Sequence, residues 1–260
     1  MTPHRIRFAA LALALFAFAG AAVGAAIELA GRRDPVKAPA FSSWIPQATT
    51  SDEVVREIAD HVQQSYLHPV DHRRLTTIAG GPLTVGSDVA KIAYPIDDSH
   101  VGIRSGTAVL YTICGLAKNC AATTGPRLSA QIAGALTRRE AFELALRTFN
   151  ASTEVDNVAV ILPPIDDPLL RGRAPRMLLL SRAEARRIVV KPLDQLLPAL
   201  SGFTSSSAIE VKKATDPFIY HYQVALSGST AQTREPVFVV TPITIEDTRQ
   251  LGGSATKPKA

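Results

Sequence analysis

The sequence predicts an α+β domain of short antiparallel strands with two main helices, placed after one N-terminal membrane-spanning or signal helix. Residues 49–67 and 127–149 repeat apolar side chains at helical spacing. Short β-prone segments separated by glycine, proline and aspartate lie between these helices and after them. An unbroken apolar run, Phe8–Ile27, precedes the whole body. With 46% hydrophobic residues, the body can bury a core.

The apolar run is long enough to cross a bilayer, because a helix of this length extends roughly 30 Å at ~1.5 Å per residue. Arg5 and Arg7 precede it, which predicts a cytoplasmic N-terminus and an exported body. Val23 and Ala25 also fit the small-residue pattern of a signal-peptidase site. Two alternatives follow: a single-pass anchor in the cell membrane with the body outside the cytoplasm, which we favour, or secretion after cleavage.

Composition divides the chain into four parts: residues 1–33 are the signal or transmembrane segment, 34–49 a proline-rich spacer, 50–243 the extracytoplasmic domain and 244–260 a disordered tail. Within the domain, Thr50 and Glu53 form a capping box for the first helix, and Thr137 and Glu140 form a second one. Residues 73–114 read as one small antiparallel sheet. Residues 155–164 read as a strand buried on both faces, and residues 216–243 as a terminal hairpin.

Cys114 and Cys120 are the only two cysteines. Zinc normally needs four ligands with shorter cysteine spacings, and a thioredoxin-like redox site needs C-x-x-C. In an exported protein the pair indicates one disulfide, with a turn supplied by Gly115 and by Lys118 and Asn119. Two free buried thiols are the remaining alternative.

The stretch from "ICGLAKNC" through "LTRREAFELALRTF" to "VDNVAVILPP" resembles a group of uncharacterised bacterial proteins with an N-terminal membrane segment and an exported domain. The shared features are a C-G-L…C turn and an R-R-E-A-x-E-L-A helix over about fifty residues. The resemblance implies export and a shared fold, and it implies no activity.

Signature motifs of common enzymes are absent: G-x-S-x-G, H-E-x-x-H, S-x-x-K, the Walker loop and G-x-G-x-x-G do not occur. "YPIDDSHVG" brings Asp97, Asp98, Ser99 and His100 together, the residue types of a hydrolytic site. Triad members usually converge from distant segments, however, and a near copy at 163–170 lacks serine and histidine. We therefore interpret P-I-D-D as a turn.

Two further histidine positions favour structural roles. His68, Asp71 and His72 lie close together in "LHPVDHRR", but Pro69 prevents the helical register that would align metal ligands. A solvated loop is the better interpretation. His221 lies between two tyrosines in a strand, which favours a packed or rim histidine.

A basic segment is the one candidate surface for an anionic partner. It is a possible anion-binding site whose members are Arg171, Arg173, Arg176, Arg182, Arg186 and Arg187, followed by Lys191. Arginine forks bind carboxylate and phosphate, so anionic lipid or cell-wall polymer is a candidate partner. The alternative is an ordinary solvated surface. Nucleic acid is not expected outside the cell, despite a pI near 9.4.

These observations predict a membrane-anchored extracytoplasmic domain without enzymatic activity, metal or cofactor, which binds an envelope partner. An envelope hydrolase using Ser99 and His100 is the alternative.

Overall fold

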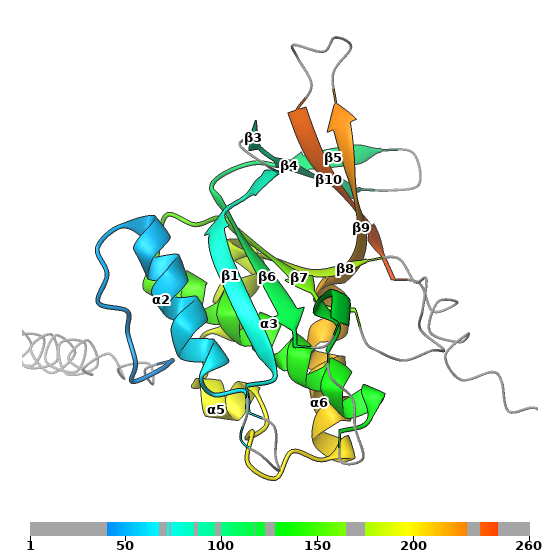
Figure 1. Ribbon diagram of the computed structural model, residues 1–260. Coiled ribbons are helices and arrows are strands. Elements are labelled where there is room, and N and C mark those ends of the chain that lie inside the picture. Colours follow the sequence, from blue (N-terminus) through cyan, green and yellow to red (C-terminus); the bar gives the residue numbers. More distant parts are fainter. Residues whose placement is uncertain are drawn as a thin grey trace, which may run out of the picture. The chain divides into compact units, whose positions relative to one another are not determined.

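Within the described part of the chain, eight strands form one mixed sheet and five α-helices accompany it, which confirms the α+β class (Figure 1). The computed structural model describes residues 41–67, 72, 74–85, 88–96, 100–116, 118–122, 128–164, 175–227 and 235–243. The expected membrane or signal segment (1–33) and the expected tail (244–260) lie outside these residues. Among the helices that the described residues form, none is both long and apolar enough to span a membrane.

The strand order keeps most neighbours in sequence side by side, and the chain crosses from one edge of the sheet to the other twice. From one edge to the other, the strands are β1 (Thr76–Pro82), β6 (Ala108–Gly115), β7 (Asn157–Leu162), β8 (Arg176–Ser181), β9 (Ile219–Ser227), β10 (Glu235–Pro242), β4 (Lys91–Pro95) and β5 (Val101–Arg104). The helices are α2 (Ser51–Gln63), α3 (Ala130–Ala151), α4 (Arg182–Ile188), α5 (Leu193–Leu196) and α6 (Ser205–Thr215), with short 3₁₀ turns η1 (Lys118–Cys120) and η3 (Asp216–Phe218).

The expectation of a purely antiparallel sheet is wrong. Strands β6 and β7 are parallel, and so are β10 and β4. The first pair is parallel because α3 intervenes and returns the chain to the same end of the sheet. Residues 73–114 do not form one small sheet either, since β1 and β6 lie near one edge whereas β4 and β5 lie at the other. The terminal hairpin of β9 and β10 is confirmed.

A short hairpin connects β1, at one edge of the sheet, with β4, near the other edge. Strands β2 (Thr84–Val85) and β3 (Asp88–Val89) pair with each other, directly after β1 and directly before β4. The Leu83 amide donates to the Ala108 carbonyl (3.1 Å), which ties this hairpin to β6. Figure 1 shows the result: β6 to β10, β4 and β1 curl into a ring of strands.

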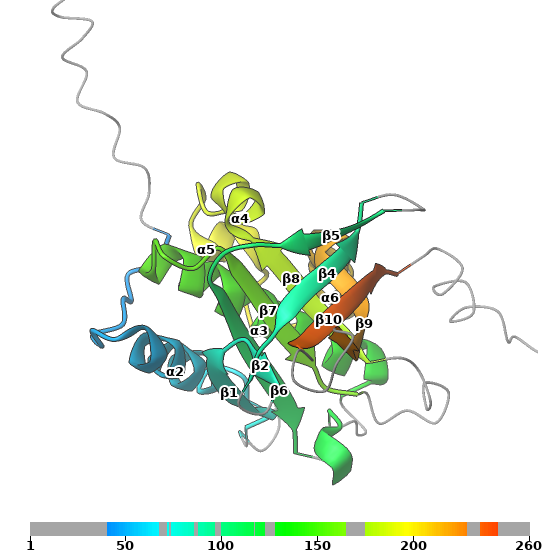
Figure 2. The same cartoon turned by 90° about the horizontal axis from the view of Figure 1, so that it is seen from above.

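The sheet separates two cores. In β8, Leu178 and Leu180 belong to the core between the sheet and helices α2 and α3. Met177 and Leu179 belong to the core inside the ring. The inner core also takes Phe238 from β10. β7 is buried on both faces, as expected from its nearly continuous apolar sequence. In Figures 1 and 2, α2 lies beside β1 and α3 runs under the sheet.

Local capping explains where the two main helices begin. Thr50 caps α2 by accepting a hydrogen bond from the Glu53 amide (3.4 Å), as expected. The expected cap at Thr137 and Glu140 is wrong, because α3 starts at Ala130, where Ser129 accepts from the Ile132 amide (3.3 Å). Thr137 and Glu140 therefore lie inside α3, and their side chains are buried.

The chain joins the body at Phe41, within the segment assigned to the spacer. Phe41 is buried, and its carbonyl accepts a hydrogen bond from the Leu193 amide at the start of α5 (3.0 Å). Trp44 stacks on His61 of α2 with ring centroids 3.8 Å apart. Apolar side chains at 41 and 44 thus fix the second half of the expected spacer to the domain.

The disulfide between Cys114 and Cys120 is confirmed, with Cα atoms 4.5 Å apart. The turn comes from η1, where Asn119 and Cys120 adopt positive φ. Gly115 is required for the close approach of the returning chain, because a Cβ there would lie 2.0 Å from the Ala121 carbonyl oxygen.

Replacing both cysteines by serine is expected to lower the free energy of unfolding by roughly 2 kcal/mol and to leave the fold intact, because the bond closes a short loop. Denaturant unfolding at fixed pH measures this difference. In the wild-type protein, denaturation without reductant should leave both thiols resistant to alkylation. Complete labelling of both cysteines before reduction contradicts the disulfide.

Candidate functional site

The residues of the hydrolase alternative are only partly described. Asp97, Asp98 and Ser99 lie outside the described residues. His100 is exposed just before β5, and its carbonyl accepts a hydrogen bond from the Ile96 amide (2.9 Å). Ile96 and His100 therefore extend the pairing of β4 with β5.

The expected histidine roles are also partly described. His68 and Asp71 lie outside the described residues, and His72 is exposed with positive φ. His221 is partly buried in β9, opposite Arg176 of β8. In the part of the chain that the structure covers, no group of three or more histidine, cysteine, aspartate or glutamate side chains is placed to hold a metal ion.

The members of the basic segment have different roles. Arg171 and Arg173 lie outside the described residues, and Arg176 is partly buried in β8. Arg182 binds carbonyl groups near the C-terminal end of α3, donating to Val155 O (2.7 Å) and to Ser152 O. Arg186 and Arg187 are exposed on α4. The structure therefore does not gather the six arginines into one described site.

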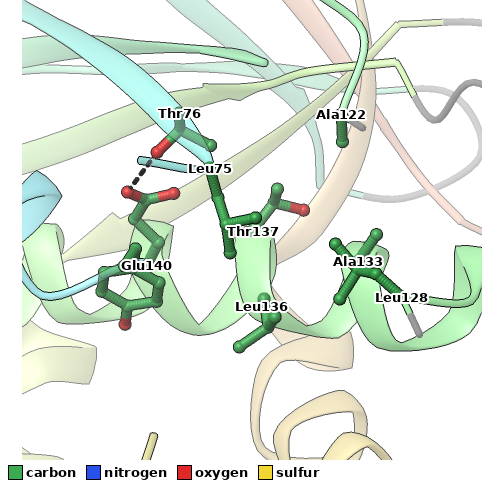
Figure 3. Close-up of a pocket in the computed structure, with 9 residues that line it drawn as sticks. Leu75, Thr76, Ala122, Leu128, Ala133, Leu136, Thr137 and Glu140 are labelled. Carbon is green, nitrogen blue, oxygen red and sulfur yellow. Dashed lines mark hydrogen bonds between the residues drawn. The ribbon is translucent and has the colours of Figure 1, made fainter. Parts of the chain in front are cut away.

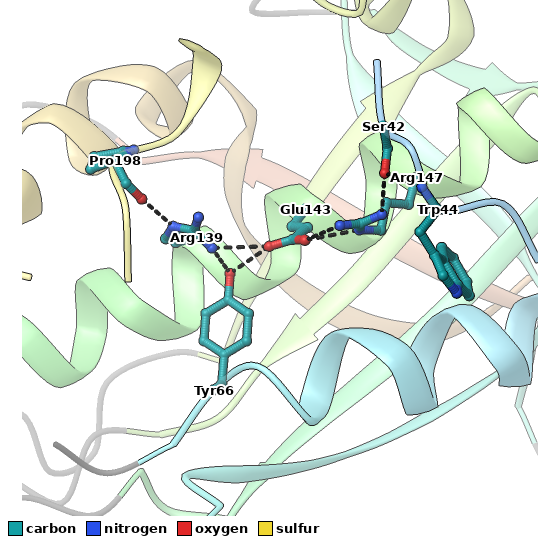
Figure 4. A network of polar contacts seen from close by, with 7 residues as sticks. All are labelled: Ser42, Trp44, Tyr66, Arg139, Glu143, Arg147 and Pro198. Carbon is teal, nitrogen blue, oxygen red and sulfur yellow. Dashed lines mark hydrogen bonds and ion pairs between the residues drawn. The ribbon is translucent and has the colours of Figure 1, made fainter. Parts of the chain in front are cut away.

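A buried ionic network on α3 is the largest polar feature that sequence reasoning missed (Figure 4). Glu143 accepts hydrogen bonds from Arg139 (2.9 Å), from Arg147 (2.8 Å) and from the Tyr66 hydroxyl (3.0 Å). Arg139 also donates to the Tyr66 oxygen and to the Pro198 carbonyl (2.8 Å). The network thereby connects α3 with the segment after α2 and with the segment after α5.

The outer end of this network reaches the residues where the chain enters the body. Arg147 donates to the Ser42 hydroxyl (2.9 Å), and its guanidinium lies 5.5 Å from the centre of the Trp44 ring (Figure 4). Arg139 and Arg147 share one buried carboxylate, so Glu143 supplies the negative charge that both guanidinium groups contact. Burial raises the pKa of Tyr66 well above its usual value, so its hydroxyl stays protonated and donates.

A small apolar pocket lies next to the network and contains a second buried carboxyl group (Figure 3). Glu140 has no exposed surface, and one of its oxygens accepts a hydrogen bond from the Thr76 hydroxyl of β1 (2.6 Å). Within the described residues, its other oxygen has no hydrogen-bond partner. The remaining walls are mainly aliphatic: Leu75, Ala122, Leu128, Ala133 and Leu136, with Tyr66 and Thr137.

Burial raises the pKa of Glu140 to about 8, and the nearby Glu143 carboxylate adds to the effect, whereas Thr76 and Arg139 oppose it. Glu140 is therefore a neutral carboxylic acid at neutral pH. The pocket has room for about one water molecule, which is too little for a substrate. The arrangement can hold or release a proton.

One sequence signal points to these buried charges. α3 carries charged residues between apolar ones throughout "TRREAFELALR", so it lacks the clean polar face of a surface helix. Such a helix is covered on several sides, and its charges must then be paired inside the protein.

Exposed apolar side chains gather at the edge of the sheet that β5 forms. Val101, Ile103 and Val239, here called the β5 surface, are all more than one third exposed. Ile103 lies opposite Ala93 of β4, which lies opposite Val239 of β10, so the row crosses three strands on one face. Helices α2 and α3 pack against β1, β7 and β8 instead.

Strand β5 is also an open edge within the described part of the chain, because it pairs only with β4. The hydrogen bond from Ile96 to His100 makes these two residues a hydrogen-bonded pair. Because such pairs alternate along an antiparallel ladder, the next ones are Tyr94 with Gly102 and Ile92 with Arg104. By the antiparallel alternation, the amides of Val101 and Ile103 then point away from β4. Pro95, which has no amide hydrogen, fits opposite Val101 for the same reason.

Comparison with protein family models, with curated proteins and with solved structures finds no match. The fold and the site define a mixed α+β domain with a disulfide, a buried ionic network and an open apolar sheet edge.

Proposed function

We propose that this protein is a membrane-anchored extracytoplasmic binding domain without enzymatic activity, and that its partner is an envelope protein that adds an extended strand to β5. The observation that carries the proposal is the open edge of β5 together with the exposed row of Val101, Ile103 and Val239. Main-chain groups on such an edge pair with any extended segment, while neighbouring side chains select its sequence.

The chemistry of the edge specifies the partner. Only two residues of β5 direct their amides outward, so main-chain bonds alone contribute little at about 1 kcal/mol each. Apolar contact must supply most of the affinity, and Ile103 and Val101 are 54% and 65% exposed. The partner segment is therefore extended and alternates apolar with polar residues, so that one row of apolar side chains packs beside Val101 and Ile103 on the same face.

Two observations support the location. A disulfide persists in an oxidising compartment, in agreement with export of the body. The apolar run Phe8–Ile27, flanked by Arg5 and Arg7, supports an anchor with the body outside. We also propose that the chain belongs with the exported bacterial proteins that its C-G-L…C turn and R-R-E-A-x-E-L-A helix resemble.

A photo-crosslinking residue at position 101 of the full chain is expected to form one adduct with a different protein in intact cells. The matched position is Ile209, which is 61% exposed on α6, a helix that packs against α3 and not against β5, and it should give no such adduct. The substitution Ile103→Asp should abolish the adduct from position 101, whereas Ile209→Asp should leave it unchanged.

Mass spectrometry of the adduct decides between the outcomes. The crosslinked peptide should come from an extended segment with alternating apolar residues. An adduct of twice the chain mass identifies a second copy of this chain and contradicts a separate partner. Persistence of the adduct in Ile103→Asp means that the β5 surface does not bind it.

A further inference from the structure

Three exposed cations follow one another at the end of α4. Arg186 and Arg187 lie in its last turn, and Lys191 follows three residues after the helix ends. None of the three forms an ion pair in the described part of the chain. The carboxylate within α4 is engaged elsewhere, because Glu184 accepts from Ser181 (2.7 Å) and from Arg104 (3.4 Å).

An exposed apolar side chain lies among these cations. Val190 is 59% exposed, although Ile188 and Val189 beside it pack against the main core. Cationic side chains around an exposed apolar one are typical of protein surfaces that contact the headgroup region of a membrane. Arg186, Arg187, Val190 and Lys191 are called the α4 face below. Asp194 on α5 is the exposed carboxylate nearest to it in sequence.

The position of the α4 face in the chain path favours a membrane. The Leu193 amide donates to the Phe41 carbonyl, so the chain enters the body two residues from Lys191. Fourteen residue steps separate Phe41 from Ile27, where the apolar run ends. A fully extended chain of this length spans at most about 50 Å. An anchor at residues 8–27 therefore limits the distance of Phe41 from the bilayer to this length.

We propose that the α4 face binds anionic phospholipid headgroups of the membrane in which the chain is anchored. This inference rests on the N-terminal anchor of the proposed function and not on the β5 surface. Charge complementarity carries it: among the described residues three exposed cations without an ion pair lie around an exposed valine, and they complement an anionic surface. Binding at α4 would orient the domain on the bilayer.

The test uses the full chain reconstituted in lipid nanodiscs, one set with zwitterionic phosphatidylcholine only and one with added phosphatidylglycerol. Amide hydrogen exchange in residues 182–191 is measured in both. With the anionic lipid, exchange is expected to slow about tenfold or more, because each cation near such a surface contributes to binding. Raising salt from about 0.1 M to about 0.5 M should reverse the effect, since exposed charges are screened.

The variant Arg186→Glu/Arg187→Glu should lose the lipid-dependent protection. The matched control is Arg56→Glu/Lys213→Glu, which reverses two exposed cations on α2 and α6 and should keep it. If both double variants melt at the wild-type temperature, the loss is not a folding defect. A double variant that unfolds is replaced by Val190→Ser, which should weaken protection without altering charge.

The outcomes separate the two proposals. A chain that is not retained in either kind of nanodisc overturns the anchor. A chain that is retained but shows equal exchange of residues 182–191 in both lipids overturns the α4 face while the anchor stands. Protection that persists at high salt or in Arg186→Glu/Arg187→Glu also overturns it.

Discussion

Replacing Glu143 by glutamine is expected to lower the free energy of unfolding by about 3–5 kcal/mol, because it removes the counter-charge of two buried guanidinium groups. Arg139 and Arg147 each bond to the Glu143 carboxylate, and neither side chain is more than 11% exposed. Glutamine keeps the shape of the side chain, so the loss reports charge and hydrogen bonding rather than a cavity.

Denaturant unfolding followed by the fluorescence of Trp44 measures this effect. Trp44 is the single tryptophan, and it lies beside Arg147 at the outer end of the network. The matched control is Glu154→Gln, which removes an exposed carboxylate just after α3 and should change stability by less than about 0.5 kcal/mol. Equal stability of Glu143→Gln and wild type would show that the network is not needed to balance charge.

Replacing Glu140 by glutamine is expected to have the opposite sign. At pH 8 the variant should be more stable than wild type, and the difference should vanish near pH 4.5. The reason is linkage: the pKa of Glu140 is raised to about 8 in the folded chain, whereas the ordinary value is 4.5. Between these pH values the unfolded chain has released a proton that the folded chain still holds.

The stability of the wild type therefore falls as pH rises from about 4.5 to about 8, and it is fully retained only below that window. At 1.36 kcal/mol per pKa unit, the complete loss is roughly 4–5 kcal/mol. His61 contributes with the opposite sign, since burial and the nearby Arg147 lower its pKa. Comparison of Glu140→Gln with wild type at each pH removes that contribution, because both proteins contain His61.

Unfolding curves of both proteins at several pH values between 4.5 and 8.5 test this expectation. A glutamine can still accept the hydrogen bond from Thr76, so the packing of the pocket is preserved. Parallel stability curves for the two proteins would refute a raised pKa at Glu140.

The sequence by itself determined the features that depend on neighbours in the chain. Helix periodicity and the Thr50 cap located α2, and the turn between Cys114 and Cys120 allowed their disulfide. The long apolar run of β7 predicted its burial on both faces. These interactions join residues within a few positions of one another, so propensity, spacing and composition are sufficient to predict them.

Only the tertiary structure decided which distant segments meet. Glu140 fits a capping pattern in sequence, yet its partner is Thr76, 64 residues away. Glu143 bonds to Tyr66 across 77 residues, and Arg147 reaches Ser42 across 105. The parallel pairing of β4 with β10 likewise joins remote strands. The physical reason is that burial depends on the whole packed core: a charged side chain on α3 has the same local sequence whether water or another helix covers it.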